Sequence, residues 1–203
     1  MKIENKDILT NILESISFVD FIKPGDIPSI DLYMDQVTTF MDDRLRSTKR
    51  SPEDKILTKT MINNYAKNNL LPPPLKKKYS EEHILILLFI YYFKNVLSIK
   101  DIESLLQPIT EQYFAADTGI DITTIYEEIY RNEQQQIESQ VETIKATYQR
   151  AQDSFANVET DDKEYLQLFS FICGLSFDVY LKKLIIEKLI DELSLQKDDE
   201  GKK

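Results

Sequence analysis

Cysteine, glycine and proline are all scarce in this sequence, and each scarcity narrows the class of protein. One cysteine among 203 residues excludes an internal disulfide and fits a reducing cytoplasm. With only 4 glycines and 7 prolines, the chain has long helix-compatible stretches, which predict an all-α fold. The longest uncharged apolar runs, residues 84–93 and 165–177, are too short to span a bilayer, so we expect no membrane segment.

The sequence also lacks the residue clusters that several functions require. The first 22 residues contain four acidic side chains, which is wrong for a secretory signal peptide, so we expect a cytoplasmic protein. His83 is the only histidine and no Cys/His cluster exists, so we expect neither a metal site nor a cofactor, and His83 is interpreted as a surface or capping residue. No phosphate loop and no nucleophile–base pair is recognisable, so an enzyme is not expected.

Charge is present in quantity but is unevenly distributed. The net charge of −10 argues against generic nucleic-acid binding. Residues 44–78, however, contain ten basic and two acidic side chains, a local charge of +8, so the rest of the chain carries −18. Such segregation predicts a surface that attracts phosphate within an otherwise repelling molecule. The alternative is a lysine-rich loop that is simply solvated.

The stretch from residue 58 to residue 106 is the most informative one, and it begins with a short helix. The hydroxyl of Thr58 can cap that helix by accepting from a backbone amide one turn later. Met61, Ile62 and Tyr65 then recur at helical spacing and give the helix one apolar side. The polar side chains expected to face outward are Lys59, Asn63, Asn64 and Lys67.

A basic loop follows this helix directly. The three prolines at 72–74 cannot continue the helix, and the three lysines at 76–78 come next. Ser80 can then cap an apolar helix whose first turn contains two glutamates. A small helix with a polar outer face beside a basic loop is typical of a nucleic-acid reader.

These residues resemble the winged helix-turn-helix of MerR-type bacterial transcription regulators. In that pattern Thr58 falls on the cap of the recognition helix, residues 63–65 on its Arg-Tyr-Tyr core, and residues 76–78 on the basic wing. The turn falls on residues 70–73, the next cap on residues 79–82 and the last helix on residues 98–106. The resemblance implies a DNA-binding domain whose contact residues are Thr58, Lys59, Asn63, Asn64, Tyr65, Lys67, Lys76, Lys77 and Lys78.

A narrower resemblance covers roughly residues 25–107. The runs LYMDQVTTFMDDRL and LTKTMINNYAKNNLLPPPLKKKYSEEHI are similar to the domain of unknown function 1836 family, a bacterial group. Against the MerR pattern the sequence departs at three positions: Asn63 replaces an arginine, Asn64 a tyrosine and Asn69 a glycine. The wing is also short and lacks glycine. These departures favour a second possibility, that the same fold docks a protein instead of DNA.

Periodicity divides the chain into four parts: an N-terminal helix (1–24), the winged helix-turn-helix domain (25–109), a helical dimerisation or effector region (110–195) and a disordered tail (196–203). Within these parts the sequence predicts a helix over 5–22 and a second helix capped by Asp31. A flexible basic loop is expected from Arg46 to Ile56. Residues 107–120 are interpreted as a connection.

Two long helices are predicted to end the chain, over Asp121–Phe155 and 163–195, paired as a helical hairpin or in a coiled-coil-like way. The second helix has more apolar residues than one face can hold, and Gly174 indicates a kink or a close crossing. In the first helix, apolar residues step by four and three, which is the spacing of a coiled-coil seam. We expect this seam to join two chains, although packing within one chain is the alternative. The dimerisation residues so predicted are Ile137, Val141, Ile144 and Tyr148.

The leading hypothesis is a cytoplasmic transcription regulator that binds double-stranded DNA as a homodimer and responds to a small-molecule or protein effector. The short helix from Thr58 to Lys67 would enter the major groove, where an asparagine can pair with adenine N6 and N7. The lysines at 76–78 and the Arg44–Lys55 loop would hold the phosphate backbone. The competing hypothesis is a protein-interaction module of the same fold.

Overall fold

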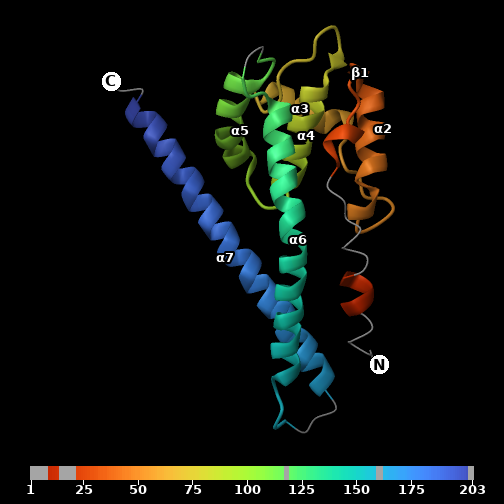
Figure 1. Cartoon of the computed structure of the whole chain (residues 1–203), viewed down its shortest axis with the longest axis vertical. Helices are drawn as coiled ribbons and strands as arrows, with labels where there is room; N and C mark the ends of the chain where they lie inside the picture. Colours follow the sequence, from red (N-terminus) through yellow and green to blue (C-terminus); the bar gives the residue numbers. More distant parts are fainter. Residues whose placement is uncertain (1–8, 14–21, 117–118, 159–161, 201–203) are drawn as a thin grey trace. The chain divides into compact units, whose positions relative to one another are not determined.

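The computed structural model describes residues 9–13, 22–116, 119–158 and 162–200, and these are mostly helical (Figure 1). Residues 9–13 form a helical segment near the N-terminus. The remaining elements, in chain order, are a 3₁₀ turn (η1, Pro24–Asp26), β1 (Leu32–Tyr33), α2 (Met34–Arg44), η2 (Arg46–Thr48), α3 (Lys59–Lys67), β2 (Lys78–Tyr79), α4 (Glu81–Phe93), α5 (Ile99–Tyr113), α6 (Ile122–Asp153) and α7 (Lys163–Glu200). In the described part of the chain, no helix is long and apolar enough to cross a membrane.

The chain divides into two compact units. The first, here called the globular unit, comprises residues 21–131 and 187–203, and the second, the hairpin unit, comprises residues 1–20 and 132–186. The helices α6 and α7 contribute to both units. Residues 58–106, which carry the sequence resemblances described above, lie entirely in the globular unit. The packing of this unit therefore decides which of them face solvent.

The core of the globular unit is built around α4. Every side chain from Ile84 to Leu88 is fully buried, as the nearly continuous apolar sequence of this helix predicts. The helices α2, α3 and α5 each contribute a buried pair at helical spacing to the same core, and α6 contributes its first turns. The hydroxyl of Tyr126 in α6 donates to the backbone carbonyl of Ile22 over 2.6 Å, which satisfies a buried phenol.

The two short strands form the only sheet among the described residues. They are antiparallel, with Leu32 opposite Tyr79 and Tyr33 opposite Lys78. This pairing joins the segment before α2 to the segment before α4. The expectation of a mostly helical chain is confirmed, with this two-stranded sheet as its small β element among the described residues.

Several boundaries differ from those predicted. The helix α2 begins at Met34, not after Asp31, because the two intervening residues pair as β1, and the Tyr33 amide donates to Gln36 Oε1 over 2.9 Å. Residues 107–113 are not a connection: α5 continues through Pro108 to Tyr113, since Leu106 is buried and the next turn packs on the core.

Other segments also differ in extent. The segment after α2 forms η2 and ion pairs, so it is more ordered than the flexible loop expected. The helix α7 extends to Glu200, into the expected disordered tail, because no glycine or proline interrupts residues 175–200. Of the N-terminal helix predicted over 5–22, residues 9–13 are helical, while residues 5–8 and 14–21 lie outside the described residues. The long helix predicted over Asp121–Phe155 is confirmed as α6.

In the hairpin unit, α6 and α7 cross closely at Gly174. A Cβ atom at this position would lie 3.0 Å from Thr147 Cγ2, so the crossing depends on the missing side chain. Beside the crossing, the rings of Tyr148 and Phe171 pack edge to face with centroids 5.3 Å apart. The structure therefore bears out the close helix crossing that the sequence indicated for Gly174.

Candidate nucleic-acid interface

The helix α3 is anchored on the core by one side and leaves a polar side exposed. Thr58 caps it, because its Oγ1 accepts from the Met61 amide over 3.2 Å. Ile62 and Tyr65 are buried, and burial raises the pKa of the Tyr65 hydroxyl. Tyr65 is therefore a packing residue whose ring is not free to read a base. The exposed side chains of this helix are Lys59, Thr60, Asn63, Asn64 and Lys67.

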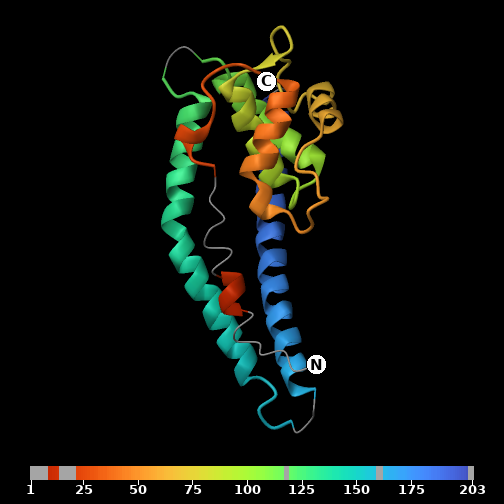
Figure 2. The same ribbon diagram turned by 90° about the vertical axis from the view of Figure 1, so that its right-hand side faces the viewer.

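The lysines after the prolines form the tip of a tight β-hairpin. The Lys78 amide donates to the Leu75 carbonyl over 2.9 Å, and this closes a two-residue turn. The two turn residues, Lys76 and Lys77, have φ of 52° and 65°. Positive φ at both central positions defines a type I′ turn, for which Asn-Gly is the usual sequence. Both lysines are exposed, and in Figure 2 the yellow hairpin projects beyond the neighbouring helices of its unit.

Contacts at the start of α2 bring the hairpin and α3 to the same edge of the globular unit. Lys59, the first residue of α3, forms an ion pair with Asp35 in the first turn of α2. Two residues earlier, the ring of Tyr33 lies under the Lys78 ammonium, 5.4 Å from ring centroid to Nζ. Lys59 of the predicted helix and Lys78 of the predicted wing are thus both held at the start of α2.

The base of the hairpin is held by His83. Its Nδ1 accepts from the Ser80 backbone amide over 3.0 Å, so the histidine caps the start of α4. Its ring packs edge to face between Tyr79 and Phe114, at centroid distances of 5.5 and 4.8 Å. Burial lowers the pKa of this imidazole. Capping was one of the two roles predicted for His83, but the residue is buried rather than at the surface.

Carboxylates from α2 and η1 neutralise part of the basic segment. Four of its ten cations are in ion pairs: Arg44 with Asp26, Arg46 with Asp43, Lys49 with Asp42 and Lys59 with Asp35. All four carboxylates lie outside residues 44–78, so the local charge of +8 counted from the sequence overstates the positive charge that a phosphate group would encounter at this surface. Among the described residues, no carboxylate lies within 4 Å of the other six cations: Arg50, Lys55, Lys67, Lys76, Lys77 and Lys78.

This pairing reduces the positive charge of the predicted loop, which keeps Arg50 and Lys55 as its cations without a carboxylate partner. Arg44, at the start of the Arg44–Lys55 loop, is already bound to a carboxylate, whereas the three hairpin lysines and Lys67 are not. The sequence signal that could have revealed this is the acidic series on α2, at positions 35, 42 and 43. Four of the six unpaired cations therefore lie at the hairpin and at the end of α3, and the other two lie in the loop.

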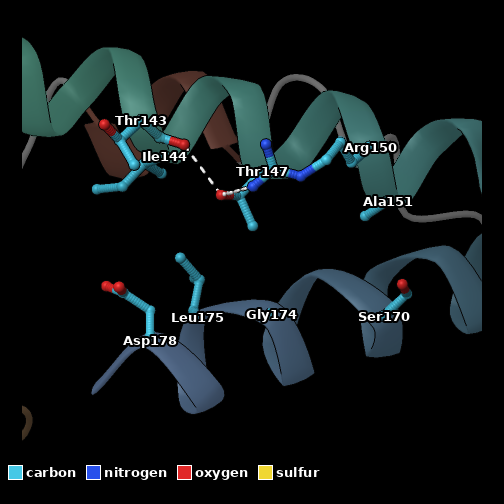
Figure 3. A pocket seen from close by; sticks show the side chains of 9 residues that line it. All are labelled: Thr143, Ile144, Thr147, Arg150, Ala151, Ser170, Gly174, Leu175 and Asp178. Atoms are coloured by element: carbon cyan, nitrogen blue, oxygen red, sulfur yellow. Dashed lines mark hydrogen bonds between the residues drawn. The ribbon is translucent and has the colours of Figure 1, made fainter. Parts of the chain in front are cut away.

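The predicted dimerisation residues lie on the side of α6 that faces α7. Tyr148 contacts Phe171 of the same chain, and Ile144 lines a groove of about 290 Å³ between the two helices (Figure 3). Ile137 and Val141 are half-buried. These contacts give Ile144 and Tyr148 a role within one chain, while a seam between two chains stays a prediction.

The groove in Figure 3 is the second candidate site. The labelled Arg150 and Asp178 lie toward its opposite ends, with Gly174 and Thr147 between them. Each charged group has a partner within the chain: Arg150 donates to Thr147 Oγ1 over 2.9 Å, and Asp178 accepts from Lys182 over 2.7 Å. Among the described residues, no group of three or more His, Cys, Asp or Glu side chains is placed to bind a metal ion.

Comparison with known proteins identifies a family. A family model described as a domain of unknown function (DUF1836) matches residues 22–129, which is more than half of the chain and includes α2 to α5 with both strands. No curated protein and no solved structure matches the chain.

Proposed function

The chain belongs to the DUF1836 family, and we propose that it is a transcription regulator that binds duplex DNA through α3 and the lysine hairpin. The observation that carries this proposal is the conjunction of two features at one edge: a helix with a polar exposed side and a turn whose tip is two unpaired lysines. In this proposal α2 and α3 are the helix-turn-helix, and β1 with β2 is the base of a MerR-like wing.

The exposed side of α3 has the chemistry of base recognition. Asn63 and Asn64 occupy its middle, and an asparagine side chain can form a bidentate pair with adenine, its Nδ2 donating to N7 and its Oδ1 accepting from the N6 amino group. Lys67 lies one turn further on, where its ammonium can reach a phosphate. Lys59 contributes less, because Asp35 already holds it.

The backbone strain of the hairpin turn supports a phosphate-binding role for its two lysines. A residue with a side chain in the left-handed region is strained by about 1–2 kcal/mol, and Lys76 and Lys77 both adopt it. An Asn-Gly turn would form the same hairpin without this strain. Backbone strain concentrates at functional sites, so two lysines in a turn that disfavours them favour a function for their charge.

We further propose that two chains act together, each α3 reading one half-site. Such an assembly doubles the phosphate contacts, so its affinity would fall steeply with salt. A protein-interaction module remains the alternative, favoured by the ion-paired Lys59 and by asparagines where the MerR pattern has arginine and tyrosine.

Selection from a random duplex library tests the proposal. We expect an enriched motif, for which Asn63→Ala costs roughly 1–3 kcal/mol while non-specific duplexes are bound as before. Lys67→Ala should weaken all duplexes about equally. Asn157→Ala, an exposed asparagine in the turn before α7, is the matched control and should change neither. No enrichment, together with a protein captured through α3, would replace the proposal with the interaction module.

A further inference from the structure

Three polar side chains begin α3, and contacts within the chain already occupy two of them. Thr58 Oγ1 accepts from the Met61 amide over 3.2 Å, and Lys59 is ion-paired with Asp35. Thr60 is exposed, and its hydroxyl forms no hydrogen bond with any residue that the structure describes. Thr60 is therefore the side chain that remains free to contact a ligand at the beginning of this helix.

Thr60 lies on the same side of α3 as the two asparagines. Residues three and four positions apart in a helix are neighbours, with Cβ atoms about 5–6 Å apart. Thr60 therefore adjoins both Asn63 and Asn64, and Lys67 continues the same exposed stripe one turn further. The stripe begins with a threonine, continues through two amides and ends with a cation.

The beginning of a recognition helix is the part that reaches the bases. In helix-turn-helix proteins the N-terminal residues of the second helix contact base edges in the major groove. In the proposed function α3 is this second helix, and Thr60 is its second residue. The free side chain thus stands where a base contact is expected.

A threonine side chain combines a hydroxyl with a methyl group, and these two groups differ in what they can distinguish. The hydroxyl can donate or accept, so it suits the edges of several bases. The methyl group makes apolar contacts, and thymine offers a matching C5-methyl group in the major groove. Because a β-branched side chain has few rotamers in a helix, holding this methyl group in place costs little conformational entropy. The discriminating group of Thr60 is therefore its methyl group.

We propose that Thr60 is a specificity-determining residue whose methyl group contacts the C5-methyl group of a thymine in each DNA half-site. This inference rests on the proposed function and adds which base the first turn of α3 selects. The asparagines one turn later pair with adenine, and successive base pairs lie about 3.4 Å apart. The selected thymine therefore lies within about two base pairs of an adenine that is read by Asn63 or Asn64.

Replacing thymine by uracil tests this contact, because uracil lacks only the C5-methyl group. In the motif selected from the random duplex library, each thymine is replaced in turn by deoxyuridine, and affinity is measured by fluorescence anisotropy. We expect one thymine per half-site at which the parent chain loses about fourfold in affinity. This loss corresponds to about 0.8 kcal/mol, the transfer free energy of one buried group of that size.

Paired substitutions at Thr60 identify the atoms that make the contact. Thr60→Ser removes the methyl group and keeps the hydroxyl, so it should bind the thymine site about fourfold more weakly and lose nothing further with uracil. Thr60→Val keeps a methyl group and removes the hydroxyl, so it should retain the uracil penalty. Affinity for non-specific duplexes should be unchanged in both variants, which shows that they fold. The matched control is Thr143→Ser, at an exposed threonine of α6, and it should behave as the parent does on both duplexes.

Different results overturn the inference and the proposed function. A motif in which no uracil replacement weakens binding, or one whose uracil penalty persists in Thr60→Ser, overturns the role of Thr60 and leaves α3 as a DNA-binding helix. Loss of the penalty in Thr60→Val overturns it as well, because the hydroxyl would then be the group that reads the base. A library that enriches no motif removes the proposed function and this inference with it.

Discussion

Replacing the strained lysines of the hairpin by the sequence that its turn prefers should separate stability from DNA affinity. In the double variant Lys76→Asn with Lys77→Gly, glycine relieves a left-handed strain of about 1–2 kcal/mol. Asparagine, which tolerates that region, relieves somewhat less. The added freedom of glycine in the unfolded chain costs about 0.5–1 kcal/mol. The net expectation is a fold more stable by about 1 kcal/mol.

The same variant should bind duplex DNA more weakly at every salt concentration. Each phosphate contact contributes about 0.9 to the slope of log K against log salt, so losing two contacts per chain should reduce its magnitude by roughly 1.8 for one bound chain and by roughly 3.6 for a two-chain complex. Urea unfolding measures the stability, and fluorescence anisotropy across a salt series measures the slope. These two readouts are expected to move in opposite directions.

Two controls isolate the causes. Replacing both lysines by glutamine removes the charge and keeps the strain, so the slope should fall without a gain in stability. Lys100→Gln removes an exposed, unpaired lysine of α5 and should leave the slope unchanged. An unchanged slope in the Asn-Gly variant would refute the phosphate role of the hairpin, and a less stable fold would refute the type I′ turn.

Three further predictions follow from contacts elsewhere in the chain. Arg44→Gln should leave the salt slope for DNA unchanged, because Asp26 already neutralises this guanidinium; a slope reduced by a full contact would contradict that. Gly174→Ala should be destabilising or neutral, because the helix-propensity gain of about 1 kcal/mol is offset by a clash with the Thr147 methyl group. When Thr147→Ser removes that methyl group in the same chain, Gly174→Ala should become stabilising. Urea unfolding in which the effects of the two substitutions simply add would argue against the contact. Burial lowers the pKa of His83 below its unfolded value, so the unfolded chain binds more protons and the unfolding free energy should fall as pH drops from about 6.5 toward the folded pKa. Because this is the only histidine, His83→Gln should abolish that dependence, and its persistence in unfolding curves at several pH values would exclude His83 as the cause.

Local sequence patterns were enough to predict the helical content, the buried side of α3 and the close helix crossing. Scarce helix breakers predicted a mostly helical chain, and the Thr58 cap with Ile62 and Tyr65 at helical spacing predicted which side of α3 is buried. The small side chain of Gly174 predicted a close crossing. These inferences succeed because capping, periodicity and side-chain size act over one or two turns of helix.

What the sequence could not supply depends on contacts between distant residues. The +8 charge of residues 44–78 is partly neutralised by Asp26, Asp35, Asp42 and Asp43, which only folding brings against it. The strained turn at Lys76 and Lys77 closes the bridge between Leu75 and Lys78, and Lys78 in turn pairs with Tyr33, more than forty residues earlier in the chain. Apolar periodicity showed that Leu181 and Ile185 need burial, but only the geometry of the α6–α7 crossing decides that one chain leaves them exposed, because burial depends on which helices approach and at what distance.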